Sequence, residues 1–256
     1  MNGGLGVIQT LKLTPRQFQP PIKSSLNNNN TSTNNNTNNN NTDKEIRVCT
    51  SKTCRRQGSQ DVLQVLTGIS PPNISVNSCG CLGRCGSGPN LVVLPSATFV
   101  NHCATASRAA DVMAVVSGYD DVGMFKKSLE ALSVRKKAEI EMESGDFVTA
   151  DLLLTQAIDL NPVGGIHYIY KDRSVTRLAM KQTVAALADA VEASTLAPKY
   201  PEAYICKGDA LMAMEQYDAA GDSYSMALEL DPSIRRSKSF KARIAMLQEK
   251  LATTNY

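Results

Sequence analysis

The sequence is poor in aromatic residues and in histidine. Only 5% of its 256 residues are aromatic, none is tryptophan, and the two histidines are His102 and His167. Proteins that bind single-stranded nucleic acid usually stack bases on exposed aromatic rings, so we expect no nucleic-acid partner. Neither histidine belongs to a carboxylate motif, and no glycine-rich nucleotide fingerprint is present. The sequence therefore predicts a protein that is not an enzyme.

Long apolar runs and acidic residues near the N-terminus are also missing. No stretch reaches 18 apolar residues, so no membrane-spanning helix is expected. The first 42 residues contain Lys12, Arg16 and Lys23 but no acid, and the rest of the chain has 24 basic and 24 acidic residues. The net charge of +3 therefore comes from the N-terminal segment, and composition alone predicts no basic partner-binding face.

Residues 1–43 are predicted to be a disordered leader. Near their end is a tract of asparagine broken only by Thr and Ser, Asn27 to Asn41, which buries too little apolar surface to offset the entropy of ordering. A segment such as 1–42, without acids and with few basic residues and many hydroxyl or amide side chains, is typical of an organellar transit peptide. Because arginine is scarce, we expect a chloroplast protein of the stroma. The alternatives are the mitochondrion, or the cytosol with a plain low-complexity tail.

Residues 44–118 are predicted to form a small α/β domain. Short strands are expected at Glu45–Val48, Ile74–Val76, Leu91–Leu94 and Thr98–Val100, with helices at Ser59–Leu66 and Ser107–Val116. The first helix is expected to be capped by Ser59. The order is β-α-β, then two strands, then α, which predicts a compact sandwich small enough for a metal centre to assist its stability.

Six of the seven cysteines lie in this domain, but there is no C-x-x-C motif. Thioredoxin-type disulfide exchange therefore lacks its usual signature. Two spaced pairs remain, Cys49 with Cys54 and Cys81 with Cys85, and the second pair lies in a glycine-rich loop. Two such pairs could bring four thiolates to one metal centre, either an iron–sulfur cluster or tetrahedral zinc. A remnant domain without a cluster is the third reading.

The segments Val48-Cys-Thr-Ser-Lys-Thr-Cys-Arg-Arg-Gln-Gly58 and Gly80-Cys-Leu-Gly-Arg-Cys-Gly-Ser-Gly-Pro89 resemble the thioredoxin-like [2Fe-2S] ferredoxins of plants and cyanobacteria. This resemblance implies a thioredoxin-like sandwich in which Cys49, Cys54, Cys81 and Cys85 ligate a [2Fe-2S] cluster. Cys79 and Cys103 fall outside the pattern and are expected to be buried or partly buried thiols. Four basic residues surround the motif: Lys52, Arg55, Arg56 and Arg84.

A linker at 119–127 is expected to join this domain to a helical repeat at 128–251. Asn161-Pro162, Ala197-Pro198 and Asp231-Pro232 close three units at spacings of 36 and 34 residues, and these units resemble tetratricopeptide repeats. Their small and aromatic signature residues are clearest in the last unit: Tyr204, Gly208, Leu211, Ala220, Tyr224, Ala227 and Pro232. A final helix near 237–251 is expected to cap the stack, and a fragment of residues 124–256 is expected to fold alone.

The whole sequence thus predicts a two-domain protein, α/β plus all-α, with a thioredoxin-like ferredoxin sandwich followed by a tetratricopeptide solenoid. The resemblance implies that the repeat groove binds a protein partner and that a redox partner meets the cluster edge. The positions aligned with the carboxylate clamp of some repeat proteins are Arg135, Glu139, Asp172, Glu202 and Cys206, so a terminal carboxylate is not the expected ligand. We expect electron transfer or redox sensing. The alternatives are a non-redox adaptor or assembly factor with a structural cluster or zinc, and a reductase subunit.

Overall fold

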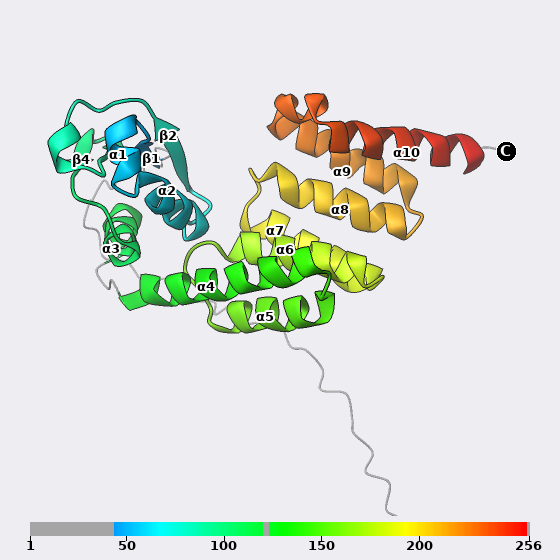
Figure 1. Cartoon of the computed structure of the whole chain (residues 1–256). Helices are drawn as coiled ribbons and strands as arrows, with labels where there is room; N and C mark the ends of the chain where they lie inside the picture. The colour runs from blue at the N-terminus through cyan, green and yellow to red at the C-terminus, as the bar shows by residue number, and fades with distance from the viewer. Residues whose placement is uncertain (1–43, 120–122, 255–256) are drawn as a thin grey trace, which may run out of the picture. The chain divides into compact units, whose positions relative to one another are not determined.

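The computed structural model describes residues 44–119 and 123–254. The predicted leader, 1–43, lies outside these residues. Figure 1 labels the elements, which begin with a small α/β region. Its strands and helices are β1 (Lys44–Cys49), α1 (Lys52–Arg56), α2 (Ser59–Gly68), β2 (Ile74–Cys79), the 3-10 turn η1 (Cys85–Ser87), β3 (Leu91–Leu94), β4 (Thr98–Val100) and α3 (Ala106–Ser117).

The four strands form one mixed sheet in the order β2-β1-β3-β4. β1 runs parallel to β2, with Ile46 opposite Val76, and antiparallel to β3, where Ile46 faces Val93. β4 pairs antiparallel with β3 at the edge. The predicted order of strands and of the two longer helices is therefore present, and only the ends of the elements differ.

Two local features differ from the sequence prediction. Cys54 lies on a short helix, α1, that was not predicted. The α2 helix is capped by Gly58, whose φ of 91° is left-handed, and not by Ser59. Ser59 is the first helical residue and its buried hydroxyl has no hydrogen-bond partner. Glycine takes the left-handed conformation without a steric penalty, so the chain turns one residue before the expected cap.

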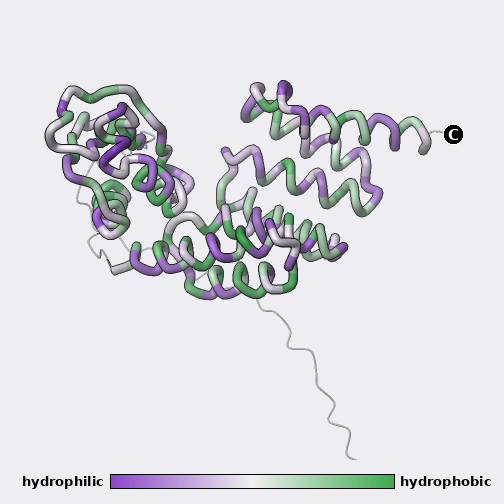
Figure 2. Tube along the Cα trace, viewed as in Figure 1, coloured by the Kyte–Doolittle hydropathy of each residue, from purple (hydrophilic) through white to green (hydrophobic). Residues whose placement is uncertain are grey.

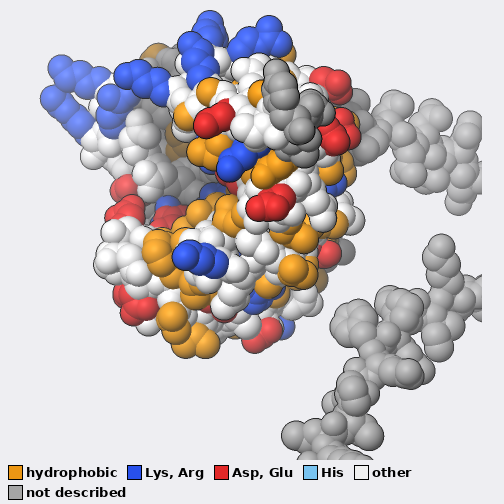
Figure 3. All heavy atoms as spheres, turned by 90° about the vertical axis from the view of Figure 1, so that its right-hand side faces the viewer, with side chains coloured by type: hydrophobic (Ala, Val, Ile, Leu, Met, Phe, Trp, Pro, Cys, Tyr) orange, Lys and Arg blue, Asp and Glu red, His pale blue; other side chains and the backbone are white. Residues whose placement is uncertain are grey.

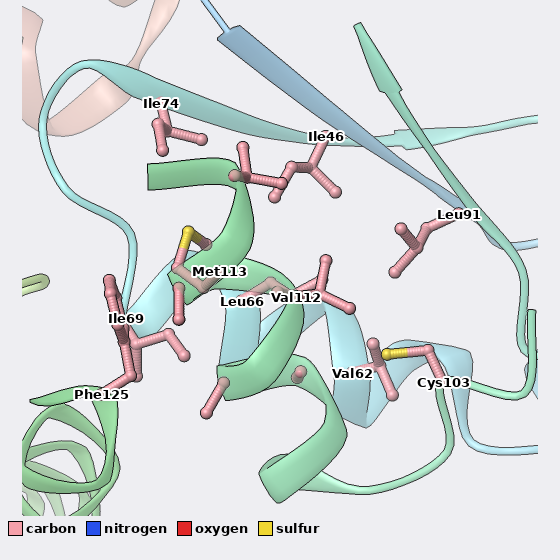
Figure 4. Close-up of a cluster of buried hydrophobic side chains, with 14 of the residues drawn as sticks. Ile46, Val62, Leu66, Ile69, Ile74, Leu91, Cys103, Val112, Met113 and Phe125 are labelled. Carbon is pink, nitrogen blue, oxygen red and sulfur yellow. The ribbon is translucent and has the colours of Figure 1, made fainter. Parts of the chain in front are cut away.

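The core of the α/β region lies between the sheet and helices α2 and α3. Figure 4 shows Val62 and Leu66 of α2 beside Val112 and Met113 of α3, below the strand residues Ile46 and Leu91. Cys103 is also in this cluster and is completely buried. Burial of these side chains, at about 1.5–3 kcal/mol for each large one, is what fixes the position of the cysteine loops beyond the sheet.

The rest of the chain is helical, as predicted. Its elements are α4 (Gly123–Ser144), α5 (Phe147–Asp159), α6 (Ile166–Ala179), α7 (Thr183–Leu196), α8 (Pro201–Ala213), α9 (Tyr217–Leu230), the 3-10 turn η2 (Pro232–Arg236) and α10 (Lys238–Thr254). Figure 1 shows them as successive helix pairs followed by α10, and Figure 2 shows hydrophobic and hydrophilic residues mixed along each helix. This is the pattern of a solenoid whose helices each bury one face.

Close contacts in the last pair explain its small residues. A Cβ atom at Gly208 of α8 would lie 2.4 Å from Cε1 of Tyr224 of α9. Ala220 and Ala227 are completely buried on the same helix as Tyr224. Gly208, a small signature residue of the last unit, therefore allows these paired helices to approach closely.

The boundary between the two regions differs from the predicted linker at 119–127. Helix α4 already begins at Gly123, and Phe125 is completely buried in the core cluster of the α/β region. Leu132 of α4 belongs to the same cluster, and the described residues lie in one compact unit. The predicted linker therefore contributes a core side chain, Phe125. A fragment that starts at residue 124 would expose Phe125 and Leu132.

Glycines allow a second contact between the two regions. A Cβ atom at Gly164, before α6, would lie 2.0 Å from the carbonyl oxygen of Ile69, and one at Gly165 would lie 2.0 Å from that of Gly68. The amide of Gly165 donates a hydrogen bond to the carbonyl oxygen of Ser70 at 3.0 Å. Backbone therefore meets backbone here, which only glycine permits.

Across residues 44–119 and 123–254, we find no helix with the length and apolar character needed to cross a membrane.

Candidate functional site

The fold brings the four predicted ligand cysteines to one end of the sheet. Cys49 is the last residue of β1 and Cys54 lies on α1, which follows directly. Cys81 lies in the loop after β2, and Cys85 begins η1. β1 and β2 are parallel and end together, with Cys49 opposite Cys79, so the segments that leave them start side by side.

Cys49 and Cys54 form a buried pair, each 1% exposed. Burial raises the pKa of the Cys49 thiol, but hydrogen bonds from the backbone of Ser51 and Leu82 and from Cys54 outweigh it and lower that pKa overall. Burial raises the pKa of Cys54. A hydrogen-bonded thiol pair in which one member ionises more readily is suited to thiolate chemistry, because the thiolate is the metal-binding form.

Cys81 and Cys85 form an exposed pair whose Sγ atoms lie 3.5 Å apart. The backbone amide of Gly83, a residue with φ of 77°, donates to Sγ of Cys81 at 3.4 Å. The hydrogen bond and negative charge of Cys81 raise the pKa of Cys85, and the charges of Cys54 and Cys49 raise it further. The two pairs are therefore near enough to influence each other's ionisation.

Asn90 connects the glycine-rich loop to α1. Its side-chain amide donates to the carbonyl oxygen of Arg84 at 2.6 Å and to Sγ of Cys54 at 3.7 Å. Asn90 is 1% exposed, and its backbone amide also donates to Cys54. The sequence analysis did not single out this residue. The sequence did contain a signal for Asn90, which is a polar residue placed directly after Gly88-Pro89 and before an apolar strand.

Gly88 leaves the space that this arrangement needs. A Cβ atom there would lie 2.9 Å from Sγ of Cys54 and 2.2 Å from Oε1 of Gln57. Any larger residue would push the loop away from α1. The glycine loop therefore approaches the buried thiol pair closely, as the motif suggested.

The donor set suits a thiolate-bound metal centre. It contains four thiols in two pairs, and backbone amides of Ser51, Leu82, Asn90 and Gly83 donate to three of the sulfur atoms. Such N–H···S bonds stabilise electron-rich sulfur. In the described residues, however, no three His, Cys, Asp or Glu side chains are grouped closely enough to hold one metal ion. The thiols stand as two pairs.

Of the other cysteines, Cys79 lies next to the buried pair, opposite Cys49, whereas Cys103 and Cys206 lie in other parts of the fold. Cys79 is partly buried at the end of β2, and burial together with the charges of Cys49 and Cys54 raises its pKa. Burial raises the pKa of Cys103 in the core to about 11 and that of Cys206 on α8 to about 12. The sequence prediction that Cys79 and Cys103 are partly or fully buried thiols is confirmed.

The repeat positions that align with a carboxylate clamp are occupied by mutual ion pairs. Nε of Arg135 donates to Oδ2 of Asp172 at 2.5 Å, and Arg135 also pairs with Glu139 at 3.0 Å. Lys171 forms a further ion pair with Asp172. Cys206 is buried and Glu202 is exposed. The cations at this place already have carboxylate partners in the same chain.

Curated proteins that resemble this chain match less than half of it. They include Tetratricopeptide repeat protein 28 of Homo sapiens (33% identity, 41% of this chain, 4% of the relative) and Protein STIP1 homolog of Dictyostelium discoideum (28%, 43% and 19%). Protein SGT1 homolog of Oryza sativa subsp. japonica is 32% identical over 44% of this chain and 29% of its own length. The chain therefore spans under a third of each of these relatives.

Solved structures of repeat domains also match about half of the chain. The first TPR domain of human RPAP3 has a TM-score of 0.45 with 22% identity, covering 49% of this chain and 94% of that domain. The Sgt2 TPR domain of Aspergillus fumigatus has a TM-score of 0.45 with 24% identity, covering 49% and 82%. No family model matches the sequence. The helical part of this chain is a solenoid of repeats similar to the tetratricopeptide repeats of these curated proteins.

Proposed function

We propose that this protein is an iron–sulfur electron-transfer or redox-sensing protein that binds a protein partner through its tetratricopeptide repeats. The observation that carries the proposal is the convergence of two cysteine pairs at one end of the sheet. Backbone amides donate to Cys49, Cys54 and Cys81 there. No acid–base or nucleophile arrangement forms part of the proposal, and we propose no enzymatic activity.

Cys49, Cys54, Cys81 and Cys85 would hold a [2Fe-2S] cluster, which when bound supplies reversible one-electron chemistry. The buried pair would shield one side of the centre, while the exposed pair would leave the other side accessible. Asn90 keeps the loop against α1, and Gly88 gives the loop room to approach. The strand order β2-β1-β3-β4 with helices α2 and α3 is consistent with the thioredoxin-like sandwich that the sequence motifs imply.

Anaerobic purification followed by iron and sulfide analysis tests this proposal. We expect about two irons and two sulfides per chain, a visible absorption spectrum that dithionite bleaches, and a paramagnetic signal in the reduced protein. Stoichiometric zinc without sulfide would reject the electron-transfer function. It would leave a structural metal site on the same cysteines.

The second candidate is a non-redox adaptor or assembly factor, in which a cluster or zinc only supports the fold. Its specific support is that the described cysteines stand as two pairs rather than as one closed ligand group. Reversible reduction of the purified protein separates the two candidates, because a structural zinc site has no redox chemistry.

The repeats are proposed to bind a protein segment other than a free C-terminal carboxylate. Among the structural matches, the first TPR of Spaghetti (RPAP3) was solved with an HSP90 peptide, SRMEEVD. In this chain Arg135 and Lys171 already form ion pairs with Asp172. We therefore expect weak binding of that heptapeptide and no loss when its terminal carboxylate is amidated, as measured by calorimetry.

The compartment is proposed to be the chloroplast stroma, on the composition of residues 1–43 alone. A fusion of these residues to a fluorescent reporter should enter plastids and be shortened there. A full-length cytosolic product would reject this location.

A further inference from the structure

The surface around the exposed cysteine pair is basic. Lys52, Arg55 and Arg56 lie on α1 beside Cys54, and Arg84 lies between Cys81 and Cys85. All four side chains are exposed, and within residues 44–119 and 123–254 none of them takes part in an ion pair. We call these four residues the basic face.

The parts of the basic face are fixed relative to one another. The side chain of Asn90 reaches both the carbonyl oxygen of Arg84, at 2.6 Å, and Sγ of Cys54, at 3.7 Å. One buried side chain therefore ties the loop that carries Arg84 to the helix that carries the other three cations. The guanidinium of Arg84 lies 4.3 Å from the ring centre of Phe99, which is 39% exposed. The basic face thus includes an apolar contact surface held by a cation–π interaction.

The positive charge is local to this part of the chain. Residues 44–118 contain seven basic and three acidic residues, whereas residues 128–251 contain 15 basic and 18 acidic ones. Of the three acids, Glu45 is paired with Arg47 at 2.9 Å, Asp61 is on α2 and Asp111 is on α3. The side of the molecule that Figure 3 shows, turned by 90° from Figure 1, carries both acidic and basic side chains. The balance of basic and acidic residues over positions 43–256 therefore conceals a basic face.

We propose that the basic face is the docking surface for an acidic redox protein, one whose carboxylates surround its own redox group. This rests on the proposed electron-transfer function and identifies the kind of partner that meets the cysteines. Complementary charges of this kind raise association rates by about 10–1,000-fold at low salt and orient the encounter. One electron crosses between the two proteins in such a contact, and no bond is made or broken.

A protein partner fits this surface better than a nucleic acid does. Bases need stacking surfaces, and Phe99, the exposed aromatic ring of the basic face, is already covered on one side by Arg84. Four cations around accessible sulfur atoms, with one apolar side chain, match the small and short-lived interfaces of electron-transfer pairs. Arg84, between Cys81 and Cys85, brings the basic face to the exposed cysteine pair.

The experiment measures electron transfer from the dithionite-reduced full chain to hexacyanoferrate(III), an anion that accepts one electron. The test variant is K52Q/R55Q/R56Q/R84Q. The matched control is R235Q/R236Q/K238Q/K241Q, which removes the same number of exposed cations from η2 and the start of α10. In stopped-flow mixing at low ionic strength, we expect the test variant to react roughly 10-fold or more slowly than the wild type. The control should be slowed less than the test variant at low ionic strength. At 0.1 M salt it should stay within about twofold of the wild type, because screening then limits the reach of its charges to about 10 Å.

A cationic oxidant, tris(phenanthroline)cobalt(III), gives the opposite expectation. The test variant should react with it faster than the wild type, and added salt should reduce both differences. If the quadruple variant loses its visible spectrum, the double variant R55Q/R56Q, which changes only exposed side chains of α1, takes its place.

The outcomes separate this inference from the function on which it rests. A colourless wild-type protein rejects the proposed function and the inference together. A coloured, reducible protein whose rates do not respond to the four substitutions keeps the proposed function and rejects the basic face. Equal slowing in the test and control variants also rejects it, because the effect would then come from net charge.

Discussion

Asp189 of α7 accepts two hydrogen bonds from the guanidinium of Arg173 of α6, at 2.8 and 3.0 Å, and is 3% exposed. Arg177, one turn further along α6, donates to Oδ2 of the same carboxylate at 2.9 Å and to Asp151 of α5 at 2.8 Å. A single buried carboxylate thus joins two arginines, and Arg177 extends the network to a third helix.

Replacing Asp189 by alanine should therefore destabilise the repeats strongly. It leaves two largely buried guanidinium groups without their shared partner, which costs about 3–5 kcal/mol for a buried pair. The matched control is Asp151→Ala, because Asp151 contacts only Arg177 in this network and is more exposed. Both side chains of that pair are partly open to solvent, at 19% and 23%, so its loss should cost less than that of Asp189, nearer to the value of about 0–1 kcal/mol for surface pairs. Urea unfolding followed by circular dichroism measures both, and equal losses would contradict the central role of Asp189.

This network shows why some features could be read from the sequence and others could not. The repeat spacing and the small residues predicted the helix pairs, since local periodicity determines them. Arg177 stands where the repeat signature has an apolar residue, and its partners Asp151 and Asp189 are 26 and 12 positions away. A pairing between helices has no local signal in one sequence.

The candidate site likewise contains some features that the sequence predicts and others that it does not. The cysteine spacing and glycines were visible in the sequence, and the structure places the four cysteines at one end of the sheet. Asn90 was not visible, because its role depends on Arg84 and Cys54 meeting in space. The linker prediction failed at Phe125 for a similar reason. The sequence around Phe125 does not reveal that this side chain enters a distant core.

The contact between the two regions predicts that Gly164→Ala is destabilising. The new Cβ would lie 2.0 Å from the carbonyl oxygen of Ile69, and this backbone atom cannot move without displacing α2. We expect a loss of about 1–3 kcal/mol from overpacking. Gly221→Ala on α9 is the control, because its Cβ would meet Leu247 at an ordinary 3.5 Å and alanine favours the helix by roughly 0.5–1 kcal/mol. A Gly164→Ala protein as stable as the control in urea would show that this contact is dispensable.

The cysteine assignment predicts which substitutions alter the visible spectrum. Serine at Cys49, Cys54, Cys81 or Cys85 removes one of four proposed ligands, so each should lower or change cluster occupancy, measured as iron per chain. Cys103→Ala is the control, since this thiol is buried in the hydrophobic core away from both pairs. Should Cys103→Ala lose iron while Cys85→Ser keeps a normal spectrum, the ligand set would be wrong.

Buried His167 predicts that stability falls in mild acid. Burial, and then the charge of Arg135, lowers its pKa to about 4, whereas histidine in an unfolded chain titrates near 6.5. Between these values the unfolded chain binds a proton that the folded chain does not, so stability decreases as pH falls through this window and is unaffected above it. The difference corresponds to about 3 kcal/mol at most.

His167→Phe tests this expectation because it keeps a ring against Tyr168 and Tyr200, whose centres lie 4.0 and 5.3 Å away, and removes the titrating group. The buried Nδ1 atom has no hydrogen-bond partner to lose. We expect wild type and variant to show the same change in unfolding free energy between pH 8 and pH 7, with the wild type losing about 2–3 kcal/mol more between pH 6.5 and pH 4.5. Subtracting the two urea-derived curves cancels the contributions of all groups that the two proteins share. Parallel curves through this range would mean that His167 gains its proton in the folded state as readily as in the unfolded one.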